Sequence, residues 1–114
     1  MDKEKLQGIL ESHEVWINGN GGIRANLSGE DLCDADLRDA NLRGANIDYA
    51  CLTLWCGSLL VNMDDRQVKQ LLYHTLSIVK NSTNVTKELK EKLLTSMNIA
   101  VAKEFHRSDE CNKL

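Results

Sequence analysis

The sequence predicts an α+β protein, in which a short coil that turns a corner every five residues is capped by helices. Three observations predict this fold class. Leucine or isoleucine recurs at every fifth position over residues 25–54. Apolar side chains recur at helical spacing on both sides of that segment. The length of 114 residues and the hydrophobic content of 42% suit one folded domain, residues 1–114.

The five-residue period excludes a single helix or a flat strand. On an α-helix, five residues turn the chain by about 140° net, so the apolar positions would spiral around the helix. On a flat strand, an odd period sends successive side chains to opposite faces. A coil with a corner in every pentad buries all the central residues in one column. These residues are Leu27, Leu32, Leu37, Leu42, Ile47 and Leu52.

The outer positions of the pentads follow a pattern of their own. The first residue is Ala in five of the six units, and the second is Asn or Asp in five. Small first residues let the walls of the coil approach closely. Asn and Asp side chains can bind backbone groups at the corners, as they do in turns. Glu30 replaces a small first residue, so we expect the coil to widen there or the carboxylate to have a partner.

These pentads resemble the A(D/N)LXX repeat of the pentapeptide-repeat family over residues 25–54. The resemblance implies a right-handed quadrilateral β-helix with four pentads per coil, so the chain would form about one and a half coils. Each pentad is then expected to stack on the fourth pentad after it, which places Asp31 over Cys51. Cys51 stands where the repeat has Asn or Asp.

The flanking segments are expected to cap the open ends of so short a coil. Residues 1–24 form the predicted N-terminal cap. Within them we expect a helix over residues 2–17, with Asp2 as its N-cap and Trp16 over the end of the coil.

Residues 55–114 are predicted to form a C-terminal helical cap. One helix is expected to begin near Asp64 and another to run from about residue 86 to 104, the two packing as a hairpin. Members of the family often dimerise through their C-terminal segments, so the resemblance also implies a homodimer. The buried stripe of the first of these helices is expected to contain Val68, Leu71, Leu72, Thr75, Leu76 and Val79.

The layout is similar to small pentapeptide-repeat proteins carried by bacteriophages and prophages. An N-terminal helix that ends in tryptophan, a short run of repeats and three later motifs carry this resemblance, which implies an origin more than an activity. The motifs are Leu54-Trp55-Cys56-Gly57, Gln70-Leu71-Leu72-Tyr73-His74 and Phe105-His106-Arg107.

Composition and motifs exclude several function classes. The chain carries 14 Lys and Arg against 17 Asp and Glu, a net charge of −3, which argues against direct binding to nucleic acid or a membrane surface. No catalytic fingerprint occurs, so we expect no enzyme and no cofactor. The N-terminus is no signal peptide, and no apolar stretch reaches the roughly 20 residues of a membrane span. A cytoplasmic protein is therefore expected, with no disulfide framework among its cysteines.

Negative charge is concentrated on the coil. Residues 25–54 hold six acids and two bases, whereas residues 55–114 hold seven acids and nine bases. Some relatives use a long acidic β-helix to mimic duplex DNA. One and a half coils would rise only about 7 Å, which corresponds to about four phosphate charges, so the charge density fits and the length does not. The simpler interpretation is that these acids are solvated turn residues.

From this charge pattern we expect a non-catalytic binding protein. The leading hypothesis is a phage-encoded inhibitor of a host protein, a nucleic-acid-handling or defence factor, contacted through the acidic coil. The predicted contact residues are Asp34, Asp39 and Asp48, which lie outside the consensus Asn/Asp position, followed by Asp31 and Glu30.

Two alternatives stay open. One is a protein that binds or sequesters a small nucleotide signal in a pocket at a dimer seam, and the other is a structural oligomerisation module. The polar residues proposed for the nucleotide pocket are Arg66, His74, His106 and Arg107. A zinc site is not expected, because the spacing of the possible ligands matches no compact zinc signature. Those possible ligands are Cys56, His74, His106 and Cys111.

Overall fold

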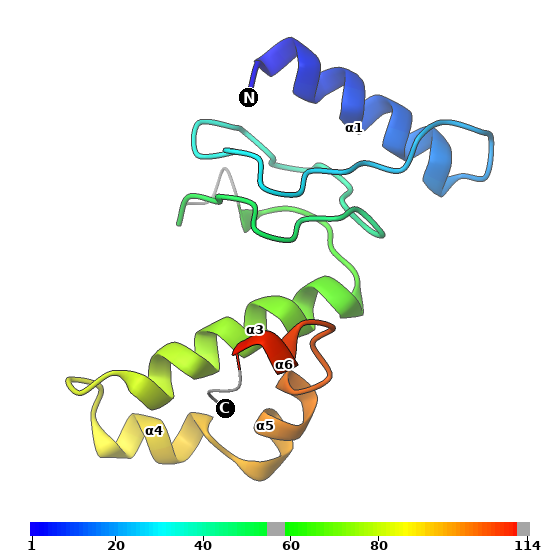
Figure 1. Ribbon diagram of the computed structural model, residues 1–114. Helices are drawn as coiled ribbons and strands as arrows, with labels where there is room; N and C mark the ends of the chain where they lie inside the picture. The colour runs from blue at the N-terminus through cyan, green and yellow to red at the C-terminus, as the bar shows by residue number, and fades with distance from the viewer. Residues whose placement is uncertain (55–58, 112–114) are drawn as a thin grey trace. The chain divides into compact units, whose positions relative to one another are not determined.

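The structure is a computed structural model that describes residues 1–54 and 59–111 (Figure 1). The chain divides into two compact units, Met1–Asp64 and Asp65–Leu114, which are described in turn as the first and second unit. The single domain expected over residues 1–114 stays a prediction. Helices in the described residues are α1 (Lys3–Ile17), α3 (Asp65–Asn81), α4 (Lys87–Leu93), α5 (Ser96–Ala102) and α6 (Ser108–Cys111).

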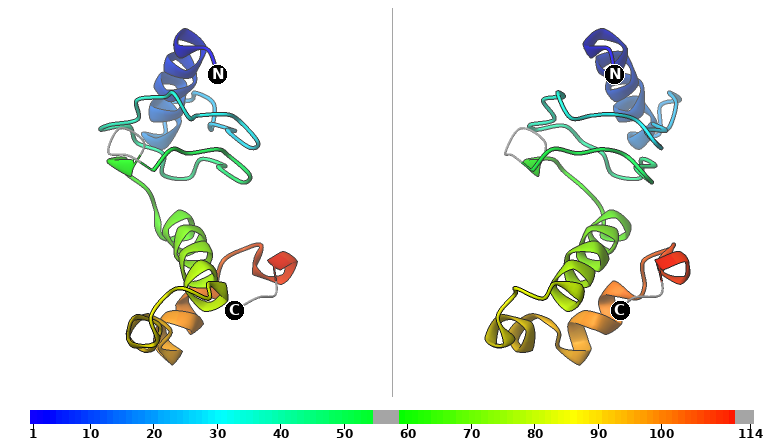
Figure 2. Two further views of the ribbon diagram at one scale, coloured as in Figure 1. Left: turned by 90° about the vertical axis from the view of Figure 1, so that its left-hand side faces the viewer. Right: turned by 60° about the vertical axis from the view of Figure 1, so that its left-hand side comes forward.

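The predicted fold class, α+β with a short right-handed quadrilateral β-helix, is wrong. Between α1 and α3 the described residues form no β-strand, only a run of turns joined by isolated parallel bridges (Figure 2). Each level pairs with the next at single positions rather than along continuous strands, so no ladder forms. The bridges pair Asn26 with Asn46, Asp31 with Cys51 and Asn41 with Asn62. We call the described residues between α1 and α3, 18–54 and 59–64, the turn coil.

The turn coil is held together within each pentad by the chemistry that the sequence predicts. The Asn or Asp at the second position accepts a hydrogen bond from the backbone N–H two residues later, as in an Asx turn. The bond from Ser28 N to Asn26 Oδ1 is 3.1 Å long, and that from Asp48 N to Asn46 Oδ1 is 3.0 Å. The same bond recurs at Asp31, Asp36 and Asn41.

Each corner is closed by a second, backbone bond. The N–H of the following pentad's first residue donates to the carbonyl of the central residue, as from Ala40 to Leu37 at 3.0 Å. The last residue of several pentads takes a left-handed conformation, which costs glycine little but strains other residues. It has φ 78° at Gly44, 64° at Asp39 and 62° at Tyr49.

The central residues share one buried interior. Leu27, Leu32, Leu37 and Leu42 are at most 1% exposed and Ile47 is 6% exposed, while Leu52 is half-buried. The expected stacking of each pentad on the fourth one after it is confirmed at two positions, including the bridge between Asp31 and Cys51. The backbone bonds from Leu42 to Asn62 and from Asn62 to Ala40 extend the stacking past residue 54, where the repeats were expected to end.

Helix α1 covers one end of the turn coil and is close to its predicted bounds. The Asp2 side chain caps it by accepting from the Glu4 N–H at 3.1 Å. Leu6 belongs to the core of the turn coil, and Ile9 and Leu10 pack against that core. The apolar face of α1 therefore removes the leucine column from water at this end.

His13 joins α1 to the turn coil by two hydrogen bonds. Its ring is fully buried, with Nδ1 accepting from the Ala25 N–H at 2.9 Å and Nε2 lying 2.8 Å from the Arg43 carbonyl oxygen. Because a carbonyl only accepts, Nε2 is the ring nitrogen that donates to Arg43. Trp16 stacks on His13 with ring centroids 5.3 Å apart and lies against Gly44.

The second unit is helical and has a small core of its own. Tyr73 and Leu76 of α3 pack against Ala102, the last residue of α5, and against Phe105, which follows that helix. The predicted helix near residue 64 is present as α3. Its buried face contains Gln67, Gln70, Tyr73, Leu76 and Val79.

Two predictions for the second unit are wrong. Of the expected stripe, Leu76 and Val79 are buried. Val68, Leu71 and Thr75 are exposed, because α3 turns its tyrosine and glutamines inward instead. The single helix expected from residue 86 to 104 is two helices, α4 and α5. Leu94 leaves the helical region at ψ 50°, and the Thr95 side chain caps α5 by accepting from the Asn98 N–H at 3.1 Å.

Candidate functional site

The acids of the turn coil line a hollow on the side that faces the start of α1. Asp31, Asp34 and Asp36 come from two successive pentads and meet Leu6 and Leu10 of the helix around a pocket of about 220 Å³. The three aspartates are exposed at their own positions. The hollow is therefore acidic on the wall formed by the turn coil, while the wall formed by the N-terminal segment is partly apolar and also carries Lys3 and the Met1 amino group.

A second hollow of about 250 Å³ lies further along the same face of the first unit. Asp36 and Asp39 of the turn coil line it together with Glu11 and Glu14 of α1. Asp36, Gln7 and Leu10 line both hollows, so the two adjoin. We call the combined surface the acidic seam. Its acids are Glu11, Glu14, Asp31, Asp34, Asp36 and Asp39.

Asp36 is the best-fixed acid of the acidic seam. Its carboxylate forms an ion pair with the Arg38 guanidinium at 2.7 Å and also accepts from the Arg38 backbone N–H at 3.1 Å. The side-chain bond is the main cause, and the backbone bond the second, that lower the pKa of Asp36 from 3.8 to about 2. Asp36 is thus ionised at any physiological pH, while Arg38 offsets part of its charge.

The structure separates the five predicted contact residues. Asp31, Asp34 and Asp39 are exposed on the acidic seam. Glu30 is half-buried, and Asp48 is only 5% exposed. Asp48 lies under the neighbouring turn, whose Gly29 N–H donates to the Asp48 carbonyl at 2.9 Å, so this side chain is poorly placed for a partner.

Two acids of the seam, Glu11 and Glu14, were missed by sequence reasoning. They belong to a helix whose apolar face indicated only a cap. Their spacing of three residues places them on one side of α1, but nothing in the sequence says which side of the turn coil that face meets. Their contribution to the acidic seam depends on packing.

The residues of the alternative nucleotide site lie in the second unit. His74 and His106 are exposed and both contact the ring of Phe105, with centroids 5.3 Å and 4.9 Å away. Arg107 forms an ion pair with Glu110 at 2.7 Å, and Arg66 is exposed at the start of α3. The structure thus brings the two histidines to one aromatic ring.

Of the four possible zinc ligands considered from the sequence, the structure describes His74, His106 and Cys111. Cys111 is half-buried against the core of the second unit and is a free thiol. Cys56 lies outside the described residues. The described part of the chain places a different set together: Asp31, Cys33 and Cys51 each offer one ligand atom, within 4.8 Å of one another.

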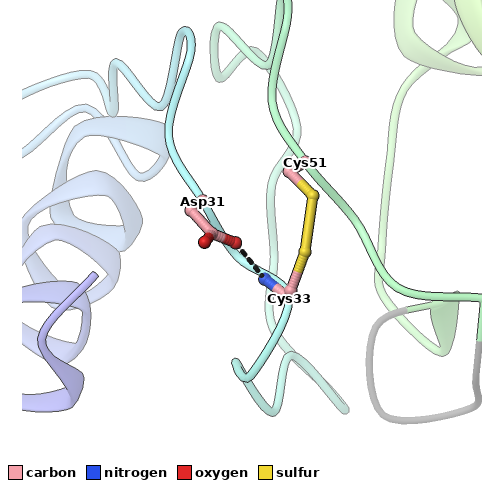
Figure 3. Close-up of side chains that lie close together, drawn as sticks. All are labelled: Asp31, Cys33 and Cys51. Carbon is pink, nitrogen blue, oxygen red and sulfur yellow. Dashed lines mark hydrogen bonds between the residues drawn. A yellow bond between two sulfur atoms is a disulfide. The ribbon is translucent and has the colours of Figure 1, made fainter.

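Cys33 and Cys51 form a disulfide, although no disulfide framework was expected among the cysteines (Figure 3). They lie 18 residues apart in sequence on successive levels of the turn coil. Stacking brings their Cα atoms to 6.0 Å, inside the range that a disulfide spans. The sequence shows no CxxC pair because the contact arises from the four-pentad register.

Comparison with known proteins identifies the repeats. The sequence model of the pentapeptide-repeat family matches residues 23–54 in eight copies, which is under a third of the chain. Pentapeptide-repeat proteins are generally non-catalytic, so this match indicates a protein-interaction or structural repeat protein. Neither the curated proteins nor the solved structures gave a match. Among the described residues, no helix combines the length and hydrophobicity needed to cross a bilayer.

Proposed function

We propose that this protein is a non-catalytic binding protein that docks its acidic seam onto a basic surface of a partner protein. The observation that carries the proposal is the gathering of six acidic side chains from α1 and the turn coil around two adjoining hollows. Turn hydrogen bonds hold the carboxylates of Asp31 and Asp36 in place before any partner arrives. Charges held in this way guide association and select the partner.

We propose that the partner is a host protein that handles nucleic acid or takes part in defence. This chain would be a phage-encoded inhibitor of that protein. A basic surface built for phosphates would accept a rigid array of carboxylates. The acidic seam is small, so it would cover part of such a surface rather than replace a long duplex. A cytoplasmic location is part of this proposal.

A homodimer formed through the second unit is also proposed. Val68, Ile78 and Met97 of the second unit are 54%, 65% and 75% exposed, so a second copy could cover apolar surface there. Self-association through these residues would present two acidic seams to one partner. Light scattering on the purified chain tests this, and a monomeric mass at high concentration would contradict it.

Affinity capture with matched variants tests the partner proposal. The seam variant is Asp34→Asn with Asp39→Asn, since Asn tolerates the left-handed conformation at Asp39. The control is Glu88→Gln with Glu91→Gln on α4, which removes the same charge from exposed side chains. A partner captured from bacterial lysate by the wild type and by the control should bind the seam variant at least about tenfold more weakly.

The salt and DNA dependence of that binding decides the finer part of the proposal. Affinity for the captured partner should fall as the salt concentration rises. Duplex DNA should displace this protein from the partner if the acidic seam occupies a nucleic-acid-binding surface. Equal binding by the seam variant and the wild type would refute the acidic seam as the contact. Binding that DNA leaves unchanged would refute a nucleic-acid surface on the partner.

A second candidate is the binding of a nucleotide signal, favoured by the two histidines that meet at Phe105. A thermal-shift screen against cyclic and linear nucleotides tests it. A rise in melting temperature that disappears in His74→Ala would support this candidate, and no rise with any nucleotide would exclude it. A purely structural module would show neither a ligand nor a partner.

A further inference from the structure

We infer that Asp31, Cys33 and Cys51 form a binding site for a thiophilic divalent cation such as Zn²⁺, which becomes available when the disulfide is reduced. This inference goes beyond the proposed function and does not depend on it. The three side chains come from successive levels of the turn coil and converge at its edge (Figure 3). Two thiolates and a carboxylate are a ligand set that Zn²⁺ accepts.

The distances suit a single cation. The three ligand atoms lie within 4.8 Å of one another. Ligands of one tetrahedral Zn²⁺, at about 2.3 Å for sulfur and about 2.0–2.2 Å for oxygen, are themselves separated by about 3.5–4 Å. Small rotations about the side-chain bonds would therefore bring all three atoms onto one ion, once the two sulfurs are no longer bonded to each other.

The backbone under the site is fixed from both levels. Leu32 N donates to the Cys51 carbonyl and Cys51 N donates to the Glu30 carbonyl, both at 2.9 Å. The Thr53 hydroxyl donates to the Cys33 carbonyl at 2.6 Å. These bonds do not involve the sulfur atoms, so they hold the two cysteines opposite each other whether or not the disulfide is present. A site fixed in this way loses little entropy when it binds an ion.

Asp31 is oriented by a bond that leaves it able to act as a ligand. Its Oδ1 accepts from the Cys33 N–H at 3.0 Å, which holds the carboxylate beside the Cys33 side chain. A carboxylate has a second oxygen that can bind a cation while the first keeps this bond. Most other pentads achieve the same turn with Asn, so the charge at position 31 is not needed for the turn itself.

The site is open to solvent on one side. Asp31 and Cys51 are exposed and Cys33 is half-buried. Three protein ligands would leave the fourth position of a tetrahedral ion to water or to another ligand. The same exposure lets an external thiol reach the disulfide, which a buried bridge would prevent.

The two steps balance in atoms and electrons. A dithiol reductant transfers two electrons and two protons to the Cys33–Cys51 bond, giving two thiols while the reductant becomes a disulfide. The divalent cation then binds both sulfurs as thiolates together with the Asp31 carboxylate, releasing the two thiol protons.

Cadmium binding by the full chain provides the test. All proteins carry Cys56→Ser and Cys111→Ser, so that the only thiols are those of the pair, and circular dichroism confirms that each is folded. After reduction and removal of the reductant, Cd²⁺ is added, and its binding is followed by the ultraviolet thiolate-to-cadmium absorption band and by calorimetry. We expect one Cd²⁺ per reduced chain, none per oxidised chain, and displacement by Zn²⁺.

Matched variants separate the roles of the three ligands. In Cys33→Ser only one thiolate of the pair remains, so the absorption band should be weaker than that of two bound thiolates. Most of the affinity for Cd²⁺ should also be lost. Asp31→Asn keeps the oxygen that accepts from Cys33 N–H but removes the charge, so it should weaken binding about tenfold or more. Asp36→Asn makes the same change one pentad further on and should leave the affinity unchanged.

Three results would overturn the inference. The reduced chain could fail to bind Cd²⁺, the oxidised chain could bind it equally well, or Asp36→Asn could weaken binding as much as Asp31→Asn does. The last result would show that the acidic surface attracts the cation without a specific site.

Discussion

At the scale of single residues, one hydrogen bond repeated along the chain explains the second position of the pentads. An Asn or Asp side chain accepts from the N–H two residues later in five successive pentads. This bond satisfies a backbone donor that the corner would otherwise leave without a protein partner. The choice between Asn and Asp is free for the turn, so it is available for charge.

The ion pair of Asp36 leads to a prediction about pH. Because Arg38 lowers the pKa of Asp36 to about 2, its carboxylate should titrate well below the ordinary value of 3.8. The stabilising interaction is complete above the ordinary pKa of 3.8 and is lost as the pH falls through about 2. Carbon-detected NMR titration of the Asp36 carboxyl measures this. In Arg38→Ala the midpoint should rise toward 3.8, and an unshifted midpoint would show that Arg38 does not lower this pKa.

Gly22 leads to a second prediction at this scale. Gly22 has φ +71°, and a Cβ there would lie 2.7 Å from Trp16 N and would also meet the Ser12 carbonyl oxygen. Gly22→Ala should therefore destabilise the first unit by about 3 kcal/mol or more, through strain and a clash with the α1 backbone.

Gly21 provides the control for that substitution. It has φ +91° but open space around its Cβ position, so Gly21→Ala should cost only about 1 kcal/mol. Urea unfolding of both variants compares the two costs. Equal destabilisation would show that the loop does not pack closely on α1 at Gly22.

At the scale of elements, α1 and the turn coil are joined by His13. Its two ring nitrogens bind the Ala25 N–H and the Arg43 carbonyl, which belong to separate pentads, so a single side chain fixes the helix to two places. The apolar contacts of Leu6 and its neighbours supply the area, and His13 supplies the position.

His13→Ala should destabilise the first unit by about 3 kcal/mol. The substitution leaves the buried Ala25 N–H and the partly buried Arg43 carbonyl without their partner and opens a cavity beneath Trp16. The matched control is His74→Ala, which removes an exposed ring and should change stability by less than about 1 kcal/mol. Urea unfolding measures both, and a loss of similar size in the two variants would rule out the special role of His13.

The elements of the second unit show where periodic patterns mislead. The spacing of Val68, Leu71 and Thr75 is as helical as that of Tyr73, Leu76 and Val79, so the pattern identifies the helix but not its buried face. Phe105 and Ala102 pack on the tyrosine side and settle the choice. The break at Leu94 and Thr95 has a local signal, because threonine is a good N-cap, but it lies inside an otherwise continuous apolar pattern.

At the scale of the whole molecule, the division into two compact units leads to a prediction about the disulfide. The Cys33–Cys51 bridge closes a loop within the first unit, and a loop of this length contributes about 3 kcal/mol by restricting the unfolded chain. Reduction of the disulfide should therefore speed amide hydrogen exchange in the turn coil and leave the exchange rates in α3 unchanged. Hydrogen exchange followed by mass spectrometry, with and without reductant, measures both units together. Faster exchange in α3 to the same extent would show that the units unfold as one.

The sequence by itself determined the local chemistry of this protein. The buried column from Leu27 to Ile47, the bonds at each corner, and the helices α1 and α3 all follow from residues close together in the chain. The predicted β-helix did not follow, because the pattern sets where the corners lie but not whether the short sides between them pair as strands.

Only the tertiary structure decided which side chains share a surface. It buried Asp48, added Glu11 and Glu14 of α1 to the acidic seam, and brought Cys33 to Cys51 beside Asp31. Each of these depends on how a helix packs on a coil or how one level stacks on another. Such contacts join residues that are far apart in sequence, so a local sequence pattern does not specify them.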